Sequence, residues 1–202
     1  PVAASARALY YNKDLLEAAG VTQPPNTWDE LLEVARKVHN PPHSYGFGLQ
    51  GKEIETDVYW YYAMWSFGGE LLTPDGLSAI NSPQAVESLQ FYYDLIHTHR
   101  VTQPEPLNYN REELQDLFKQ GRLGMMITGP WLVGQLRAEA PHINFGVAPI
   151  PMKNRRVTYG VTDTIMMFRS AKDKEAAWKF LEFAFSDENR YRFNTAEGFL
   201  PV

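Results

Sequence analysis

The sequence predicts an α/β domain in which helices cover both faces of a mixed sheet. Short apolar segments typical of strands alternate with stretches whose apolar residues recur at helical spacing. With 202 residues, 44% apolar and 13% aromatic, the chain can build a sizeable core. Its length fits one large domain or two small ones.

Composition narrows the classes of partner. The net charge of -5, with basic residues scattered among acidic ones, gives no footprint for nucleic acid. No apolar run approaches the roughly 18 residues that span a bilayer. The absence of cysteine excludes disulfides, thiol catalysis and cysteine metal sites. Without an initiator Met or a basic-then-apolar leader, the chain is expected to be a processed or excised piece. A small molecule or a protein is the expected partner.

The first half of the chain predicts strands and helices in alternation. Thr27 and Glu30 form a capping box that begins a helix running through residue 38. Ser82-Pro83 is a typical helix start, and 101–109, polar and proline-bearing, is expected to be an irregular loop. The expected strands are 8–11, 45–50 and 77–80, and the other expected helices are 13–19 and the ring-rich 57–67.

The stretch 121–131 predicts a binding edge. A buried strand at 123–127 stops at Thr128-Gly129-Pro130, and Pro130 is suited to the first position of a helix. Trp131 therefore follows directly on the end of a strand, where open α/β sheets hold ligands. Further strands are expected at 143–149 and 164–168, a basic loop at 152–158, helices at 171–185 and 188–193, and an extended end at 198–202.

Catalytic and cofactor motifs are weak. The glycines of 46–51 have dinucleotide-fingerprint spacing, but 40–44 is no hydrophobic strand, so glycines in a strand and its turn are the better interpretation. His39 and His43 have ligand spacing, but the prolines between them forbid the helix. Acidic pairs such as Glu112 with Glu113 fall in predicted first helical turns, where they favour the macrodipole. We expect no cofactor, no metal and no catalytic residue.

Aromatic residues near the ends of predicted elements are the strongest anomaly. Sugars stack their C–H faces on such rings while their hydroxyls form hydrogen bonds. For any single ring, ordinary core packing is at least as probable an explanation. Tyr62 and Phe91 are expected in the core, whereas Trp131 is the ring expected to bind.

Five blocks, in this order, resemble the extracellular solute-binding proteins of the maltose-binding-protein type. They are Ala-Leu-Tyr-Tyr-Asn-Lys-Asp-Leu at 8–15, Pro-Pro-Asn-Thr-Trp-Asp-Glu-Leu at 24–31, the stretch 121–131, the Lys-Glu-Ala-bearing 171–181, and Gly-Phe-Leu-Pro at 198–201. Together they cover nearly the whole chain.

The resemblance implies a periplasmic-binding-protein-like type II C-terminal lobe, spanning 1–202 as a single α/β lobe with both ends at hinge crossings. Its partner lobe would be absent from this chain. The implied function is capture of a carbohydrate or carbohydrate derivative, such as a sugar-alcohol phosphate, by hinge closure. The capture would take place outside the cytoplasm and serve the membrane subunits of an ATP-binding-cassette importer. An isolated lobe should bind weakly or undetectably.

The resemblance also carries over individual residues of the cleft. Trp131 corresponds to the stacking ring, and Asp163 either accepts sugar hydroxyls or caps a turn. The other positions are polar, loop or aromatic residues, with those of the ring-dense helix aligning less well: Ser5, Gly129, Gly160, Val161, Phe199, Tyr59, Trp60 and Trp65.

A second functional class stays open at this point. A carbohydrate-active hydrolase could hide its acid pair among the 24 acidic residues. Such an enzyme needs two carboxyl groups about 5 to 10 Å apart across a cleft, which sequence cannot test.

Overall fold

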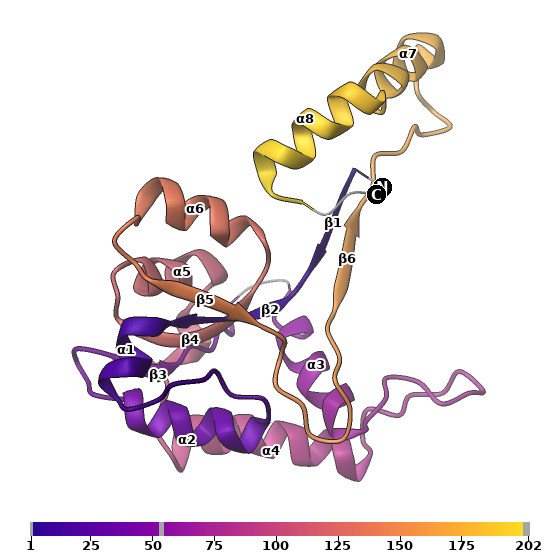
Figure 1. Ribbon diagram of the computed structural model, residues 1–202. Coiled ribbons are helices and arrows are strands. Elements are labelled where there is room, and N and C mark those ends of the chain that lie inside the picture. Colours follow the sequence, from indigo (N-terminus) through magenta and orange to yellow (C-terminus); the bar gives the residue numbers. More distant parts are fainter. Residues whose placement is uncertain (1, 53–54, 200–202) are drawn as a thin grey trace.

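A four-stranded mixed sheet forms the centre of the computed structural model, which describes residues 2–52 and 55–199. The strands are β2 (Ala8–Asn12), β3 (Tyr45–Phe47), β4 (Leu123–Thr128) and β5 (Phe145–Ala148), in the order β3-β4-β2-β5. β2 pairs antiparallel with β4 and β5, whereas β3 runs parallel to β4. Figure 1 shows this sheet between its helices, which confirms the predicted α/β class.

The helices form two layers. Helices α1 (Lys13–Ala18), α2 (Trp28–Val38), α3 (Val58–Phe67) and α4 (Pro83–His97) contribute to one core cluster. Helices α5 (Arg111–Lys119) and α6 (Trp131–Glu139) build a second cluster against the opposite face. A short 3₁₀ turn (Pro106–Asn108) precedes α5 within the predicted loop.

Alternation along the strands explains the two clusters. In β2, Leu9 packs into the first cluster and Tyr10 into the second, because neighbouring side chains on a strand point to opposite faces. In β4, Met125 and Met126 divide in the same way. Both faces are covered, so β4 appears in the sequence as a continuous apolar run.

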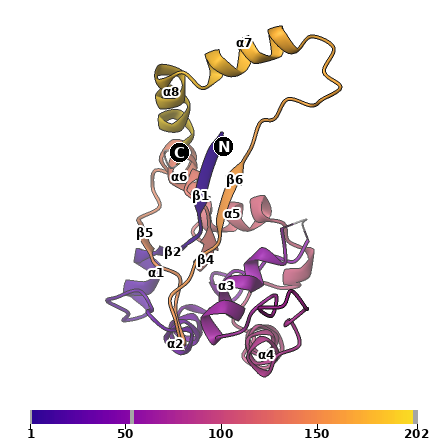
Figure 2. The same cartoon turned by 90° about the vertical axis from the view of Figure 1, so that its right-hand side faces the viewer.

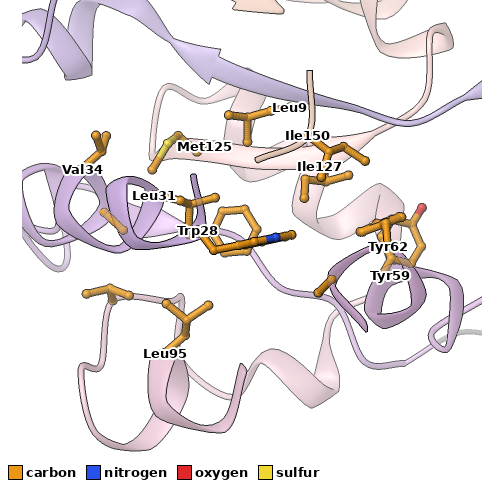
Figure 3. Packing of buried hydrophobic residues seen from close by; sticks show 14 of the residues in the cluster. Leu9, Trp28, Leu31, Val34, Tyr59, Tyr62, Leu95, Met125, Ile127 and Ile150 are labelled. Carbon is orange, nitrogen blue, oxygen red and sulfur yellow. The ribbon is translucent and has the colours of Figure 1, made fainter. Parts of the chain in front are cut away.

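Trp28 anchors the first cluster. Its side chain is 1% exposed, meets Phe91 and Tyr92 edge-on at 5.8 and 6.0 Å between ring centroids, and donates from Nε1 to Ser66 Oγ at 3.2 Å. Figure 3 shows it between the sheet and α4. The predicted capping box at Thr27 is present and fixes where this ring enters the core.

A two-stranded ribbon leaves the sheet. β1 (Ala3–Ala6) pairs antiparallel with β6 (Gly160–Asp163) and leads toward α7 (Lys174–Ala184) and α8 (Asp187–Glu197). These two helices follow each other end to end and stand away from the four-stranded sheet (Figures 1 and 2). Neither contains a buried residue, although the sequence gives α7 an apolar stripe.

Several sequence-based element predictions are wrong in position. Residues 77–80 form no strand but only an isolated bridge between Leu72 and Ser78. The strand expected at 164–168 lies earlier, at Gly160–Asp163, because pairing with β1 decides which residues become extended. The strand expected at 45–50 ends at Phe47. Of the extended end expected at 198–202, residues 200–202 lie outside the described residues.

The glycine-rich segment serves packing. A Cβ on Gly46 would lie 2.2 Å from the carbonyl oxygen of Ala35, so only glycine lets β3 approach α2 this closely. This explains the fingerprint-like spacing without a nucleotide. Within the part of the chain that the structure describes, no helix has the length and apolarity needed to cross a bilayer.

Candidate functional site

An open cleft of about 340 Å³ lies where the β1–β6 ribbon meets α5 and α6. The ribbon supplies one wall, and the first turns of the two helices supply another. Eleven residues line the cleft: Ser5, Arg7, Glu55, Arg111, Glu112, Gln115, Trp131, Gln135, Val161, Asp163 and Phe199. Most carry planar polar groups that can donate to or accept from a polar ligand.

The turn after β4 places Trp131 in this cleft. β4 ends at Thr128, Gly129-Pro130 makes the turn, and α6 begins at Trp131 itself. A Cβ on Gly129 would lie 2.2 Å from Cη2 of the indole, so the ring lies directly against this glycine. Tyr10 holds the turn by donating its hydroxyl to the Gly129 carbonyl at 3.0 Å. Trp131 is partly buried, as a ring at the edge of a core should be if it contacts ligand.

Two guanidinium groups lie over the Trp131 ring. The Cζ atoms of Arg7 and Arg111 are 4.8 and 5.0 Å from the ring centroid, within cation–π distance. Arg7 also donates from Nη1 to Ser5 Oγ at 2.9 Å. The indole is therefore oriented by its neighbours before any ligand arrives.

Carboxylates neutralise both cations. Glu55 Oε2 lies 3.1 Å from Arg7 Nη2 and 3.4 Å from Arg111 Nη1, and Glu112 Oε1 lies 2.9 Å from Arg111 Nη2. Partial burial acts to raise the pKa of Glu112, but the hydrogen bond and charge of Arg111 outweigh it, and the pKa is lowered. A lowered pKa is the opposite of what a glycosidase proton donor needs, so Glu112 does not support the hydrolase alternative.

Of the ten site residues predicted from sequence, five line the cleft. Ser5 and Val161 face each other in the register of the ribbon, and Trp131, Asp163 and Phe199 complete the set. The main-chain carbonyl of Asp163 also accepts from Val2 N at 2.6 Å.

The other five do not line it. Gly129 supports Trp131 from behind, and Gly160 is an exposed ribbon residue beside Val161. Tyr59 and Trp60 line a separate apolar pocket between α3 and α4. Trp65 stacks on Tyr159, with 5.8 Å between ring centroids. A binding role for these five residues stays a prediction, and the geometry of the cleft does not support it.

Sequence reasoning missed the polar walls: Arg7, Glu55, Arg111, Glu112, Gln115 and Gln135. A signal for Arg7 existed, because it lies two residues after Ser5 in an extended segment, where such residues share a side. Glu112 was interpreted only as a helix-end charge, and its position in α5 satisfies that interpretation as well. Among the described residues, no three His, Asp or Glu side chains gather as a metal site.

A sequence profile of the bacterial extracellular solute-binding proteins matches residues 1–191. The chain belongs to this family. A putative binding protein of Brucella abortus is 54% identical to this solute-binding protein over 100% of the chain and 50% of the relative. The maltotriose-binding protein of Pyrococcus abyssi is 29% identical over 100% of the chain and 43% of its own length.

Solved structures agree with the family assignment. A solute-binding protein of Thermotoga lettingae with bound α-D-tagatose superposes on this solute-binding protein with a TM-score of 0.88, at 31% identity, over 97% of this chain and 52% of that one. A maltose-bound T. maritima protein superposes with a TM-score of 0.87, at 34% identity, over 100% of this chain and 53% of that one. These neighbours confirm the periplasmic-binding-protein-like fold. The chain spans about half the length of the curated relatives it matches.

Proposed function

We propose that this solute-binding protein captures a carbohydrate or polyol in the Trp131 cleft and releases it unchanged. The observation that carries the proposal is a partly exposed indole surrounded by planar donors and acceptors, Arg7, Arg111, Glu55 and Gln135 among them. A sugar ring needs this combination, since its C–H face is apolar and its hydroxyls both donate and accept. Relatives described as maltotriose-binding and as bound to tagatose support it.

A second lobe is part of the proposal. The structure leaves large apolar side chains of α7 uncovered: Trp178, Phe180 and Phe183 are 54, 58 and 66% exposed. Soluble proteins rarely leave such a patch open. We propose that a protein as long as the relatives has a second lobe, which packs against α7 and α8 and supplies the opposite wall of the cleft. Ligand contact with both walls would then favour the closed state.

The transport role follows from the same reasoning. A receptor that encloses a solute without chemistry must pass it to another protein. We propose the membrane subunits of an ATP-binding-cassette importer as that protein and a location outside the cytoplasm, in the periplasm or at the cell surface. Both are supported by the family's description as extracellular and by a relative of Escherichia coli described as a putative ABC transporter periplasmic-binding protein.

Nuclear magnetic resonance of the tryptophan indoles tests the capture proposal. Maltose, tagatose and ribitol are titrated into the chain, and the Trp131 indole signal is followed. We expect millimolar binding that moves this signal in the wild type and in Tyr93→Ala, a control whose ring is 55% exposed on α4. Trp131→Ala lacks this signal, so its binding is followed from the resonances of the sugar, and we expect it to be lost. Turnover of any sugar would contradict capture without chemistry.

Calorimetry tests the second lobe separately. A single wall should hold only part of the affinity, so the chain alone should show weak or undetectable heats. Micromolar or tighter binding by the 202-residue chain would contradict the proposal that the opposite wall is essential. A protein that includes the second lobe should bind the same sugar at least a hundredfold more tightly, by about 2.7 kcal/mol or more.

A further inference from the structure

Glu55 occupies a particular place in the cleft because one of its carboxylate oxygens serves two cations. Arg7 comes from the link between β1 and β2, and Arg111 from the first turn of α5, yet both reach Glu55 Oε2. Glu55 itself precedes α3. The residue thus joins three segments that are distant in sequence around the rim of Trp131.

Arg7 depends on this carboxylate more than Arg111 does. The Arg7 side chain is 2% exposed, whereas that of Arg111 is 23% exposed and has Glu112 as a second partner. A buried cation that water cannot reach needs an anion or acceptors close by. Apart from Ser5 Oγ, Glu55 is the partner that the described residues provide for the Arg7 charge through its Nη atoms.

Charge balance in the cleft follows from these pairs. The lining residues carry three carboxylates, on Glu55, Glu112 and Asp163, against two guanidiniums, which leaves a formal charge of -1. Both guanidiniums are already engaged by carboxylates. An anionic ligand would meet no uncommitted cation among these residues and would be repelled by the excess negative charge.

We propose that Glu55 is a specificity-determining residue that makes the cleft accept uncharged polyols and reject phosphorylated, sulfated or uronate sugars. It does so by holding Arg7 and Arg111 in ion pairs, which cancels the charge of both guanidinium groups. The inference rests on the proposed function, because it concerns the same cleft. It adds which chemical class of solute the cleft excludes, and through which residue.

Glu55→Gln tests the inference, with Glu70→Gln as the matched control. Glu70 also pairs with an arginine, Arg155, but outside the cleft. The probe is sodium sulfate, compared with sodium chloride at equal ionic strength, and the readout is the Trp131 indole signal. We expect sulfate to leave the Trp131 indole signal unchanged in the wild type and in Glu70→Gln. Glu55→Gln should bind sulfate about tenfold or more tightly than the wild type does, which is the effect of one released charge interaction.

Matched sugars complete the experiment. Glucose and glucuronate share a ring and differ by a carboxylate, so their affinity ratio reports charge selectivity. The ratio should favour glucose in the wild type by about tenfold and fall toward one in Glu55→Gln. Equal glucose and glucuronate affinities in the wild type, or sulfate binding by the wild type, would overturn the inference even if Glu55→Gln did not fold.

Failure of the proposed function gives a different pattern. If neither sugar moves the Trp131 signal in any variant, the capture proposal fails. The sulfate comparison still decides whether Glu55 cancels the charge of the two arginines. If sugars bind but Glu55→Gln weakens glucose and glucuronate equally and gains no sulfate, only the role of Glu55 is refuted.

Discussion

Replacing Gly129 by alanine would place a methyl group against the ring of Trp131. The added Cβ would lie 2.2 Å from Cη2 and Cζ3 of the indole and 2.7 Å from Cε3. Such separations cannot be kept, so the ring must swing away. The main chain adds no strain of its own, since Gly129 is not among the glycines with positive φ.

The expected cost has two parts. Forcing a methyl group into a packed contact costs about 1–3 kcal/mol. A displaced indole also loses its contacts with the Arg7 and Arg111 guanidiniums, at 4.8 and 5.0 Å, which are worth about 0.5–1 kcal/mol each where partly exposed. A total of about 2–5 kcal/mol would lower the melting temperature of a chain this long by about 4–20 °C.

A double-mutant cycle measures whether the ring is the cause. Urea unfolding is followed for Gly129→Ala, Trp131→Ala and the double variant, and the coupling is calculated. We expect Gly129→Ala to be nearly neutral once the indole is gone. An equal cost in both backgrounds would refute the reasoning. Gly134→Ala is the control, because a Cβ there meets nothing within 4 Å in α6 and should stabilise by about 1 kcal/mol.

Three further predictions concern stability. Thr27→Ala should lower the free energy of unfolding, measured in urea, by about 1 kcal/mol, because the Thr27 hydroxyl accepts a hydrogen bond from Glu30 N at 3.1 Å. An unchanged urea midpoint of unfolding would contradict this. Gly46→Ala should cost about 3 kcal/mol or more in the same assay, because its Cβ would meet main-chain atoms of Ala35; a stable variant would show that β3 can move. Burial raises the pKa of Tyr10 to about 12, so the unfolded chain loses this proton first, and the stability contributed by Tyr10 should fall as pH rises from about 10 to 12. The free energy of unfolding, measured in urea across that pH range, should fall less steeply for Tyr10→Phe than for the wild type. Identical dependence on pH in the two proteins would contradict the assignment.

Much of the fold was predictable because local rules and tertiary packing agree. The capping box at Thr27, the proline start of α4 and the apolar run of β4 all predict elements that the structure contains. The failures share one cause. Residues 164–168 look like a strand, but none of the described residues pairs with them, and Ile165, Met166 and Phe168 remain 44, 61 and 70% exposed. A strand forms where another strand pairs with it.

The cleft was predictable only in part for a related reason. Trp131 could be placed from sequence, because a strand that stops at Gly-Pro must deliver its next residue at a sheet edge. Glu55 and Arg111 could not, since each is an ordinary charged residue on its own. Their role depends on contacts between distant parts of the chain: Glu55 meets Arg7, 48 residues away, at 3.1 Å, and Arg111, 56 residues away, at 3.4 Å.

The sequence by itself therefore determined the α/β class, the family and the position of Trp131 just after the end of β4, since these depend on periodicity, turn chemistry and ordered blocks of residues. Tertiary structure alone decided that the walls around Trp131 are paired charges, and that Tyr59, Trp60 and Trp65 lie elsewhere. The physical reason is that ion pairs and cleft walls join residues distant in the chain, so no local pattern records them.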